Sequence, residues 1–277
     1  MTKTTLNIKG ELLDISSPVI MGIINLTADS FYDGGKIKSD RDLLLKAEKM
    51  IGEGAAILDV GAYSSRPGAD DVPIELEIKN STAGINTILK EFPKAIVSVD
   101  SFRAKVAQSG IENGASIIND ISGGDLDSDM YDTVAALKVP YIMMHMRGNP
   151  QTMSQLTEYE DLASEVIDYF NLKVNQLKSK GVTDIILDPG FGFAKTREQN
   201  FELLSKLELL NMLDLPVLCG VSRKSMIWKS LEITADEALN GTTALNTVCL
   251  MKGASILRVH DVKEAQETIK LVEMINN

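Results

Sequence analysis

The stretch Val19–Thr27 reads VIMGIINLT, and its apolar residues continue to Ile24 before the amide of Asn25 interrupts them. A short, nearly continuous run rich in Val and Ile is typical of a strand that is buried on both faces of a parallel sheet. Runs of the same kind recur along the rest of the chain, at Ala56–Gly61, Ile96–Asp100, Ser116–Ile121, Val139–His145, Ile185–Asp188, Pro216–Val221 and Ser255–His260.

Amphipathic stretches separate these runs. Leu43, Ala47 and Met50 follow the i, i+4, i+7 spacing of one helix face, with Asp40 in the region of the N-cap. Similar patterns predict helices near residues 75–91, 102–113, 127–137, 158–180, 197–212, 235–252 and 262–275. A glycine lies shortly before several of the runs, where the C-terminal glycine of a helix belongs: Gly54, Gly114, Gly181 and Gly253.

Eight alternations of strand and helix in about 260 residues favour an α/β fold of the (β/α)8 TIM-barrel type. The alternative is an open, doubly wound sheet, which has fewer strands at this length and a glycine fingerprint after its first strand. Here Asn25-Leu26-Thr27-Ala28-Asp29-Ser30 follows the first run instead. We expect residues 1–17 to form a short N-terminal arm or hairpin and residues 18–277 to form a single barrel domain.

The composition limits the classes of molecule that the protein is expected to bind. The chain has 277 residues, 44% of them hydrophobic and 24% charged, which argues against disorder. Its formal net charge of −11 disfavours nucleic acid and anionic membrane surfaces, although a small anionic substrate can still bind in a locally basic pocket. The two cysteines, Cys219 and Cys249, suggest neither a disulfide framework nor a zinc site, so we expect a cytoplasmic protein.

Nearly every apolar run ends in polar or charged residues. In a barrel these strand ends meet on one face, where the active sites of the fold lie. Carboxylate and amide acceptors suit the N–H edge of a nitrogen heterocycle, and cationic side chains suit phosphate. The mixture indicates a heterocyclic substrate with an anionic leaving group. The residues are Asn25, Asp59, Ser64-Ser65-Arg66, Asp100, Asn119-Asp120, His145, Arg147, Asp188, Ser222-Arg223-Lys224-Ser225, Arg258, His260 and Asp261.

Some of these residues have a simpler interpretation. His145 is compatible with a core histidine as well as with a site residue. Asp59 can pair with a neighbouring strand-end residue or cap a helix, and Asp120 can be structural. Arg147 and Arg223 are also compatible with solvated surface positions.

Eight short motifs follow one another along the chain: MGIINLTADSFYDGG at 21–35, DVGAYSSRPGA at 59–69, SVDS at 98–101, IND at 118–120, MHMRG at 144–148, LDPGFGF at 187–193, SRKS at 222–225 and RVHDV at 258–262. Together, and in this order, they resemble the motifs of the dihydropteroate synthase family, the folate-pathway target of sulfonamides. The similarity extends from about residue 19 to the end of the chain.

The resemblance implies a transferase of folate biosynthesis. The family condenses 6-hydroxymethyl-7,8-dihydropterin pyrophosphate with p-aminobenzoate, through a pterin cation, to give 7,8-dihydropteroate and pyrophosphate. It also implies Mg²⁺ as a cofactor and a homodimer, with small molecules rather than nucleic acid or membrane as partners.

The resemblance assigns site residues by position. Those of the pterin pocket are Asp100, Asn119, Asp188, Lys224 and Arg258, of which Asp100, Lys224 and Arg258 are expected to be catalytic. Those of the pyrophosphate side are Asn25, Ser65, Arg66, Arg258 and His260, with Asn25 also a ligand of Mg²⁺. Those of the p-aminobenzoate pocket are Pro67, Phe193, Lys224 and Ser225.

The chain departs from the family pattern at a few positions. Ala28 stands where the first motif usually has Pro, Ala62-Tyr63-Ser64-Ser65 where the second usually has Gly-Glu-Ser-Thr, and Ala194 where the sixth usually has Gly. The changes in the first two motifs concern the loops around residues 28–35 and 62–69, which we expect to close over the substrate.

Two other functions remain open at this point. A methyltetrahydrofolate-binding methyltransferase domain that serves a corrinoid protein shares the barrel and related acidic residues, but does not need the motif at 222–225. A catalytically silent pterin-binding paralogue is the second alternative, which the departures at Ala28 and Tyr63 leave open.

Overall fold

The eight predicted strands form one parallel sheet that closes into a barrel in the computed structural model, which describes residues 3–26, 39–63 and 71–276. The strands are β3 Val19–Asn25, β4 Ile57–Gly61, β5 Ile96–Asp100, β6 Ile117–Asp120, β7 Tyr141–Met144, β8 Ile185–Asp188, β9 Leu218–Cys219 and β10 Ile256–Val259. Their order is β8-β7-β6-β5-β4-β3-β10-β9, and a parallel bridge between Leu187 and Val217 closes the ring. The TIM-barrel prediction is confirmed.

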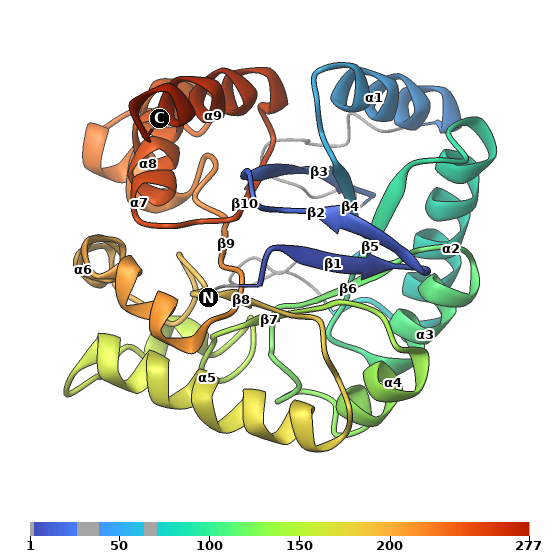
Figure 1. Ribbon diagram of the computed structural model, residues 1–277, viewed down its shortest axis with the longest axis horizontal. Coiled ribbons are helices and arrows are strands. Elements are labelled where there is room, and N and C mark those ends of the chain that lie inside the picture. The colour runs from blue at the N-terminus through green and yellow to red at the C-terminus, as the bar shows by residue number, and fades with distance from the viewer. Residues whose placement is uncertain (1–2, 27–38, 64–70, 277) are drawn as a thin grey trace.

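Helices surround the barrel (Figure 1). They are α1 Asp40–Gly52, α2 Ile74–Glu91, α3 Ala104–Glu112, α4 Met130–Leu137, α5 Leu162–Ser179, α6 Arg197–Ser205, α7 Ser225–Leu231, α8 Leu239–Met251 and α9 Val262–Asn276. The predicted face of α1 is buried, and all four glycines predicted to end helices have a positive φ. Within the described ranges, no helix combines the length and the hydropathy that crossing a bilayer requires.

Three details of the helices differ from the sequence-based expectation. The N-cap of α1 is Ser39 rather than Asp40, and its hydroxyl accepts a hydrogen bond from the Asp42 N–H at 3.2 Å. The helix expected over 197–212 is divided into α6 and a 3₁₀ segment, Leu207–Leu213. Periodicity did not locate helix α7, because seven residues are too few to display a periodic apolar face.

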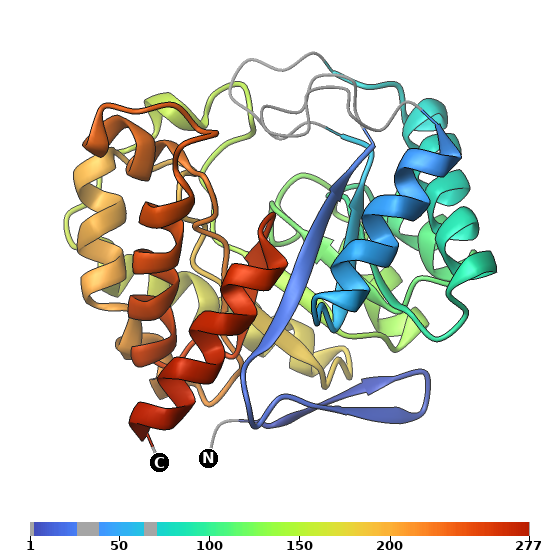
Figure 2. The same cartoon turned by 90° about the horizontal axis from the view of Figure 1, so that it is seen from above.

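The N-terminal segment forms a hairpin of β1 Thr5–Ile8 and β2 Glu11–Asp14. The two residues between the strands, Lys9 and Gly10, both have a positive φ, as a two-residue type I′ turn requires. Figure 2 shows the hairpin across the end of the barrel where the strands begin.

Buried side chains seal this end of the barrel. Leu6 and Ile8 of the hairpin belong to one apolar cluster with the first residues of the barrel strands, which include Met21, Ile57, Ile117, Ile142, Ile186, Leu218 and Ile256. The hairpin therefore covers the apolar end of the barrel and leaves the carboxyl ends of the strands, at the opposite side, for the site.

The hairpin is expected to stabilise the fold without contributing to the site. Leu6 is completely buried, so Leu6→Ala should lower the free energy of unfolding by about 2–5 kcal/mol. Leu12, on the same hairpin, is 71% exposed, and Leu12→Ala should change it by less than about 0.5 kcal/mol. Urea denaturation measures both changes. Equal losses for the two variants would contradict this role of Leu6.

Candidate active site

Four predicted site residues lie at or next to the carboxyl ends of four barrel strands. Asn25 ends β3, Asp100 ends β5, Asn119 is the next-to-last residue of β6, and Asp188 ends β8. The register pairs Asp100 with Gly61 on one side and with Asn119 on the other. A Cβ atom at Gly61 would lie 3.2 Å from the Asp100 Cβ, so this glycine leaves room for the carboxylate.

One guanidinium joins two carboxylates at the centre of these strand ends. Arg258 Nε donates to Asp59 Oδ2 at 2.6 Å, and Arg258 Nη2 donates to Asp100 Oδ2 at 2.7 Å. Asn119 Nδ2 also donates to Asp59 Oδ2, at 3.0 Å. Asp59 therefore pairs with a neighbouring strand-end residue, the simpler of the interpretations that its sequence position allowed.

Asp59, Asp100 and Arg258 together carry one net negative charge when both carboxylates are ionised. Burial and, after it, the nearby Asp59 carboxylate raise the pKa of Asp100 to about 7, while Arg258 opposes the shift. The Asp59 Oδ1 atom is buried and accepts no hydrogen bond from the described residues. Because a buried acceptor without a donor is unfavourable, this oxygen suits an N–H group of a ligand.

A lysine and a third carboxylate lie on the other side of the same pocket. Asp188 Oδ1 accepts the Gly190 N–H at 2.8 Å, and burial raises the pKa of Asp188. Lys224 Nζ donates to the Phe191 carbonyl and lies 4.8 Å from the centre of the Phe193 ring. Burial lowers the pKa of Lys224 to about 8, although Asp188 opposes that shift.

Six of the predicted residues therefore line one pocket: Asp100, Asn119, Asp188, Phe193, Lys224 and Arg258. Its free volume is about 20 Å³, roughly enough for one water molecule. The Arg258 side chain lies between Asp59 and Asp100, so a bicyclic ligand can enter only if side chains such as Arg258 move.

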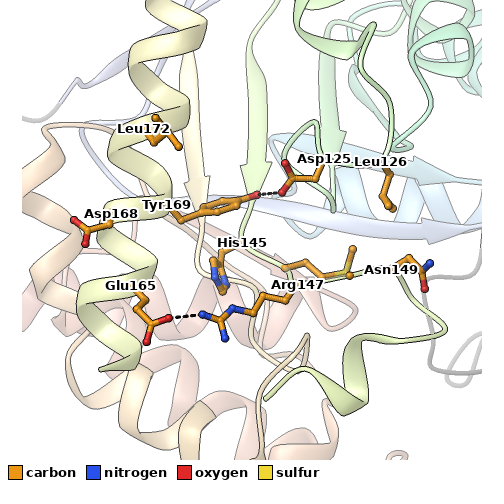
Figure 3. A pocket seen from close by; sticks show the side chains of 11 residues that line it. Asp125, Leu126, His145, Arg147, Asn149, Glu165, Asp168, Tyr169 and Leu172 are labelled. Carbon is orange, nitrogen blue, oxygen red and sulfur yellow. Dashed lines mark hydrogen bonds and ion pairs between the residues drawn. The ribbon is translucent and has the colours of Figure 1, made fainter. Parts of the chain in front are cut away.

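The described residues also form a second cavity, of about 720 Å³ (Figure 3). His145, Tyr169 and Arg147 line it, and Arg147 is ion-paired with Glu165. Although larger, this cavity contains none of the residues expected to bind pterin, and its lining carboxylates and arginine come from α5 and the loops after β6 and β7. We therefore place the candidate active site in the smaller pocket.

The residues of the predicted pyrophosphate side are only partly described. Ser222 Oγ accepts the His260 N–H at 3.2 Å and lies 3.0 Å from His260 Nδ1. Burial and the nearby cations hold the pKa of His260 well below its ordinary range, so the imidazole is uncharged without a ligand. Ser65 and Arg66, which are also predicted for this side, lie outside the described residues, as do 28–35 and most of 62–69.

The predicted p-aminobenzoate side is also only partly described. Pro67 lies outside the described residues, and Ser225 is exposed and begins α7.

The surface interpretation of Arg223 is wrong. Its side chain is buried and forms a bidentate ion pair with Asp261, with Nε–Oδ2 and Nη2–Oδ1 distances of 2.8 and 2.9 Å. Arg223 also donates to the Ala235 carbonyl at 3.0 Å. Spacing alone could not reveal this pair, because its members are 38 residues apart. It ties the turn that contains Lys224 to the end of β10.

The structure also shows the contacts of Asp120 and His145, for which the sequence left two interpretations. Asp120 accepts hydrogen bonds from Ser122 and, at 2.7 Å, from the Tyr141 hydroxyl, so it is satisfied within the protein. His145 is 2% exposed, and its Nδ1 lies 2.9 Å from Nζ of the buried Lys195. No sequence signal distinguished Lys195 from the polar residues that follow it.

Comparisons with known proteins agree on one family. A family model described as "Pterin binding enzyme" matches residues 21–260. The dihydropteroate synthase of Escherichia coli K12 is 40% identical over 96% of this chain and 94% of its own length, and that of Clostridium beijerinckii is 43% identical over 92% and 93%.

Solved structures agree with the sequence relatives. The Yersinia pestis dihydropteroate synthase in complex with a sulfonamide drug superposes with a TM-score of 0.94, at 35% identity over 98% of this chain and 99% of that one. The Xanthomonas albilineans enzyme with 4-aminobenzoic acid has a TM-score of 0.91, at 32% identity over 99% of both chains. These relatives support the synthase and not the methyltransferase alternative. The chain therefore belongs to the dihydropteroate synthase family of pterin-binding enzymes.

Proposed function

We propose that this protein condenses 6-hydroxymethyl-7,8-dihydropterin pyrophosphate with p-aminobenzoate to give 7,8-dihydropteroate and pyrophosphate. The observation that supports this most strongly is the group formed by Asp59, Asp100 and Arg258, of which Asp100 and Arg258 line the pocket. The group carries one excess negative charge when both carboxylates are ionised. A pocket of this charge stabilises a substrate that becomes positively charged during the reaction.

The pterin ring offers an edge of N–H donors and a carbonyl group. In the lining of the pocket, Asp188 and Asn119 supply acceptors of suitable chemistry and Lys224 supplies a donor. The unpaired Oδ1 of the buried Asp59 is a further acceptor. The guanidinium of Arg258 is planar, so once displaced from the carboxylates it can pack on the ring face. We assign these residues to pterin binding.

The chemical step separates charge. The bond between the pterin methylene carbon and the pyrophosphate oxygen breaks, the electron pair leaves with pyrophosphate, and a delocalised cation remains on the pterin. The amine nitrogen of p-aminobenzoate then forms the new C–N bond with its lone pair and releases a proton to solvent. Asp100 and Arg258 contact the reacting substrate in this proposal: the carboxylate stabilises the cation and the guanidinium the departing anion. No covalent intermediate with the enzyme is needed.

The pyrophosphate side suits Mg²⁺ only together with the substrate. The described residues contain no group of three His, Cys, Asp or Glu side chains that could hold a metal by itself. Asn25 ends β3 half-buried and offers one neutral carbonyl oxygen, which fits an ion that takes most of its ligands from phosphate and water. When bound, Mg²⁺ would add positive charge next to the leaving group. His260 and, from their sequence positions, Ser65 and Arg66 complete this side.

The p-aminobenzoate side is assigned to Phe193, Lys224, Ser225 and, from its sequence position, Pro67. The ring of Phe193 offers an apolar wall next to the Lys224 ammonium. Ser225 begins α7, where backbone N–H groups favour a carboxylate.

We also propose a cytoplasmic homodimer. Both cysteines are free and buried, which suits a reducing compartment. Large apolar side chains are exposed on three successive helices, which supports an interface there: Leu231, Met251, Leu271 and Met274.

The activity is tested with the purified protein, both substrates and Mg²⁺. We expect pyrophosphate release only when both substrates are present, and a product with the mass of 7,8-dihydropteroate. Tight binding of the pterin pyrophosphate without turnover would contradict the proposal and would favour a catalytically silent paralogue.

Asp100→Asn should separate catalysis from binding. The amide removes the negative charge that stabilises the cation, so turnover should fall about 100-fold or more. The affinity for pyrophosphate, measured by calorimetry, should change by no more than about threefold, because its cationic ligands remain. Parallel losses in turnover and in pyrophosphate affinity would mean that Asp100 only maintains the pocket.

The pH profile should report the ionisation of Asp100. Since burial and Asp59 raise the pKa of this group to about 7, the carboxylate form is lost as the pH falls through 7. For the free enzyme, kcat/KM should therefore rise with pH to a plateau above 7, and Asp100→Asn should lack this rise. The variant serves as the control for titration of the substrate, and an identical rise in both proteins would refute the assignment.

A further inference from the structure

The loop between β8 and α6 has an unusual backbone. Three of its residues adopt a positive φ: Gly190 at 70°, Gly192 at 83° and Ala194 at 48°. Glycine accepts this conformation without strain, but alanine does not. A Cβ at Gly190 would lie 2.1 Å from the His145 carbonyl oxygen, so the loop also passes very close to the end of β7. Side chains must hold a loop of this shape in place.

A single buried ammonium makes three contacts with this loop and its neighbour. Lys195 Nζ donates to the Gly190 carbonyl at 3.1 Å and to the Phe193 carbonyl at 3.0 Å. It also lies 2.9 Å from His145 Nδ1. Burial and the nearby cations hold the pKa of His145 well below its ordinary range, so the imidazole is neutral and its Nδ1 can accept the third hydrogen bond.

The site of Lys195 is unfavourable for a charged side chain because it is poorly solvated. Lys195 is 8% exposed, and burial lowers its pKa to about 7, although Asp188 opposes the shift. Three hydrogen bonds from one ammonium offset this cost, because bonds to a charged donor are stronger than neutral ones. A charged side chain in this position therefore fixes the relative positions of Gly190, Phe193 and His145.

The same loop forms one wall of the active site. The ring of Phe193 lies next to Lys224 Nζ, which in turn donates to the Phe191 carbonyl. A shift of the loop would therefore move both the apolar wall and Lys224, the lysine that we assign to both substrates. Among the residues assigned to pterin, Asp188 and Lys224 contact the loop, whereas Asp100, Asn119 and Arg258 come from other strands.

We infer that Lys195 is a positioning residue for the second substrate: by tying the Gly190 and Phe193 carbonyls to His145, it holds Phe193 and Lys224 in the geometry that binds p-aminobenzoate. This inference rests on the proposed function and deepens it. Lys195 itself contacts neither substrate in this account, because it acts through the loop.

The test is the steady-state kinetics of Lys195→Met, which removes the ammonium and retains the aliphatic stem. We expect KM for p-aminobenzoate to rise about tenfold, the equivalent of one strong hydrogen bond. KM for the pterin pyrophosphate should rise by no more than about threefold, because Asp100, Asn119 and Arg258 remain in place to bind that substrate. Equal increases in the two KM values, or no increase for p-aminobenzoate, would overturn the inference.

Lys173→Met is the matched control. Lys173 is also 8% exposed, and its ammonium also donates to a carbonyl, that of Gly123 at 2.9 Å, but in the loop after β6. Both variants should lose stability in thermal denaturation, because each loses a buried ammonium with its contacts. Only Lys195→Met should raise KM for p-aminobenzoate selectively. The same selective rise in Lys173→Met would show that any buried lysine has this effect, and would overturn the inference.

A second variant serves if Lys195→Met does not fold. His145→Phe removes the Nδ1 acceptor and retains a planar ring next to Tyr169, and it leaves both carbonyl contacts of Lys195. It should raise KM for p-aminobenzoate in the same selective way, and an unchanged KM would overturn the inference. The wild-type assay separates this failure from that of the proposed function, since an inactive wild-type protein contradicts the function itself.

Discussion

The sharing of Arg258 between Asp59 and Asp100 is the interaction on which the site depends. It connects the last strand of the barrel to the second and third, in a place where none of the three side chains is fully solvated. One guanidinium cannot neutralise two carboxylates, and burial, together with this imbalance, raises the pKa of Asp100 to about 7. A cation that forms beside Asp100 supplies the missing positive charge. The resting ion pairs thus prepare the pocket for charge separation.

The two ends of the barrel have different roles: one end stabilises the fold and the other carries the candidate active site. At the end where the strands begin, the hairpin and the first strand residues bury an apolar cluster. At the other end, the strands finish in carboxylates, amides and cations, which are held in place by contacts between different loops. The Arg223–Asp261 pair and the contacts of Lys195 have the same effect: each fixes a loop that the sheet hydrogen bonds do not reach. The chain is acidic as a whole, yet Lys224 and Arg258 supply local positive charge for an anionic substrate.

Periodicity in the sequence predicted the elements whose form it determines directly. The run Ile96–Asp100 is strand β5 without a shift, and Gly54 and Gly253 end helices as expected. The pattern failed for α7, which is too short to repeat, and for Leu207–Leu213, where a tighter turn interrupts an apparently continuous helix. The positions of Asp100, Asn119, Asp188, Lys224 and Arg258 around one pocket followed from the convergence of strand ends.

The partners of side chains could not be predicted in the same way. Arg223 looked like a surface residue because its partner, Asp261, is distant in sequence, and Lys195 looked like any lysine in a polar stretch. Whether a charged side chain is buried depends on tertiary contacts that local sequence does not encode. The contacts of Arg258 were not predicted either. Its place at the end of a strand put it in the pocket, but the sequence did not indicate that it lies between two carboxylates.

A crystal structure with the pterin pyrophosphate bound tests the central claim most directly. The account predicts that Arg258 leaves its position between Asp59 and Asp100, that the pterin N–H edge meets Asp188, Asn119 and the Asp59 Oδ1 atom, and that the methylene carbon lies near the Asp100 carboxylate. A ligand bound elsewhere, with Arg258 still between the two carboxylates, would contradict it.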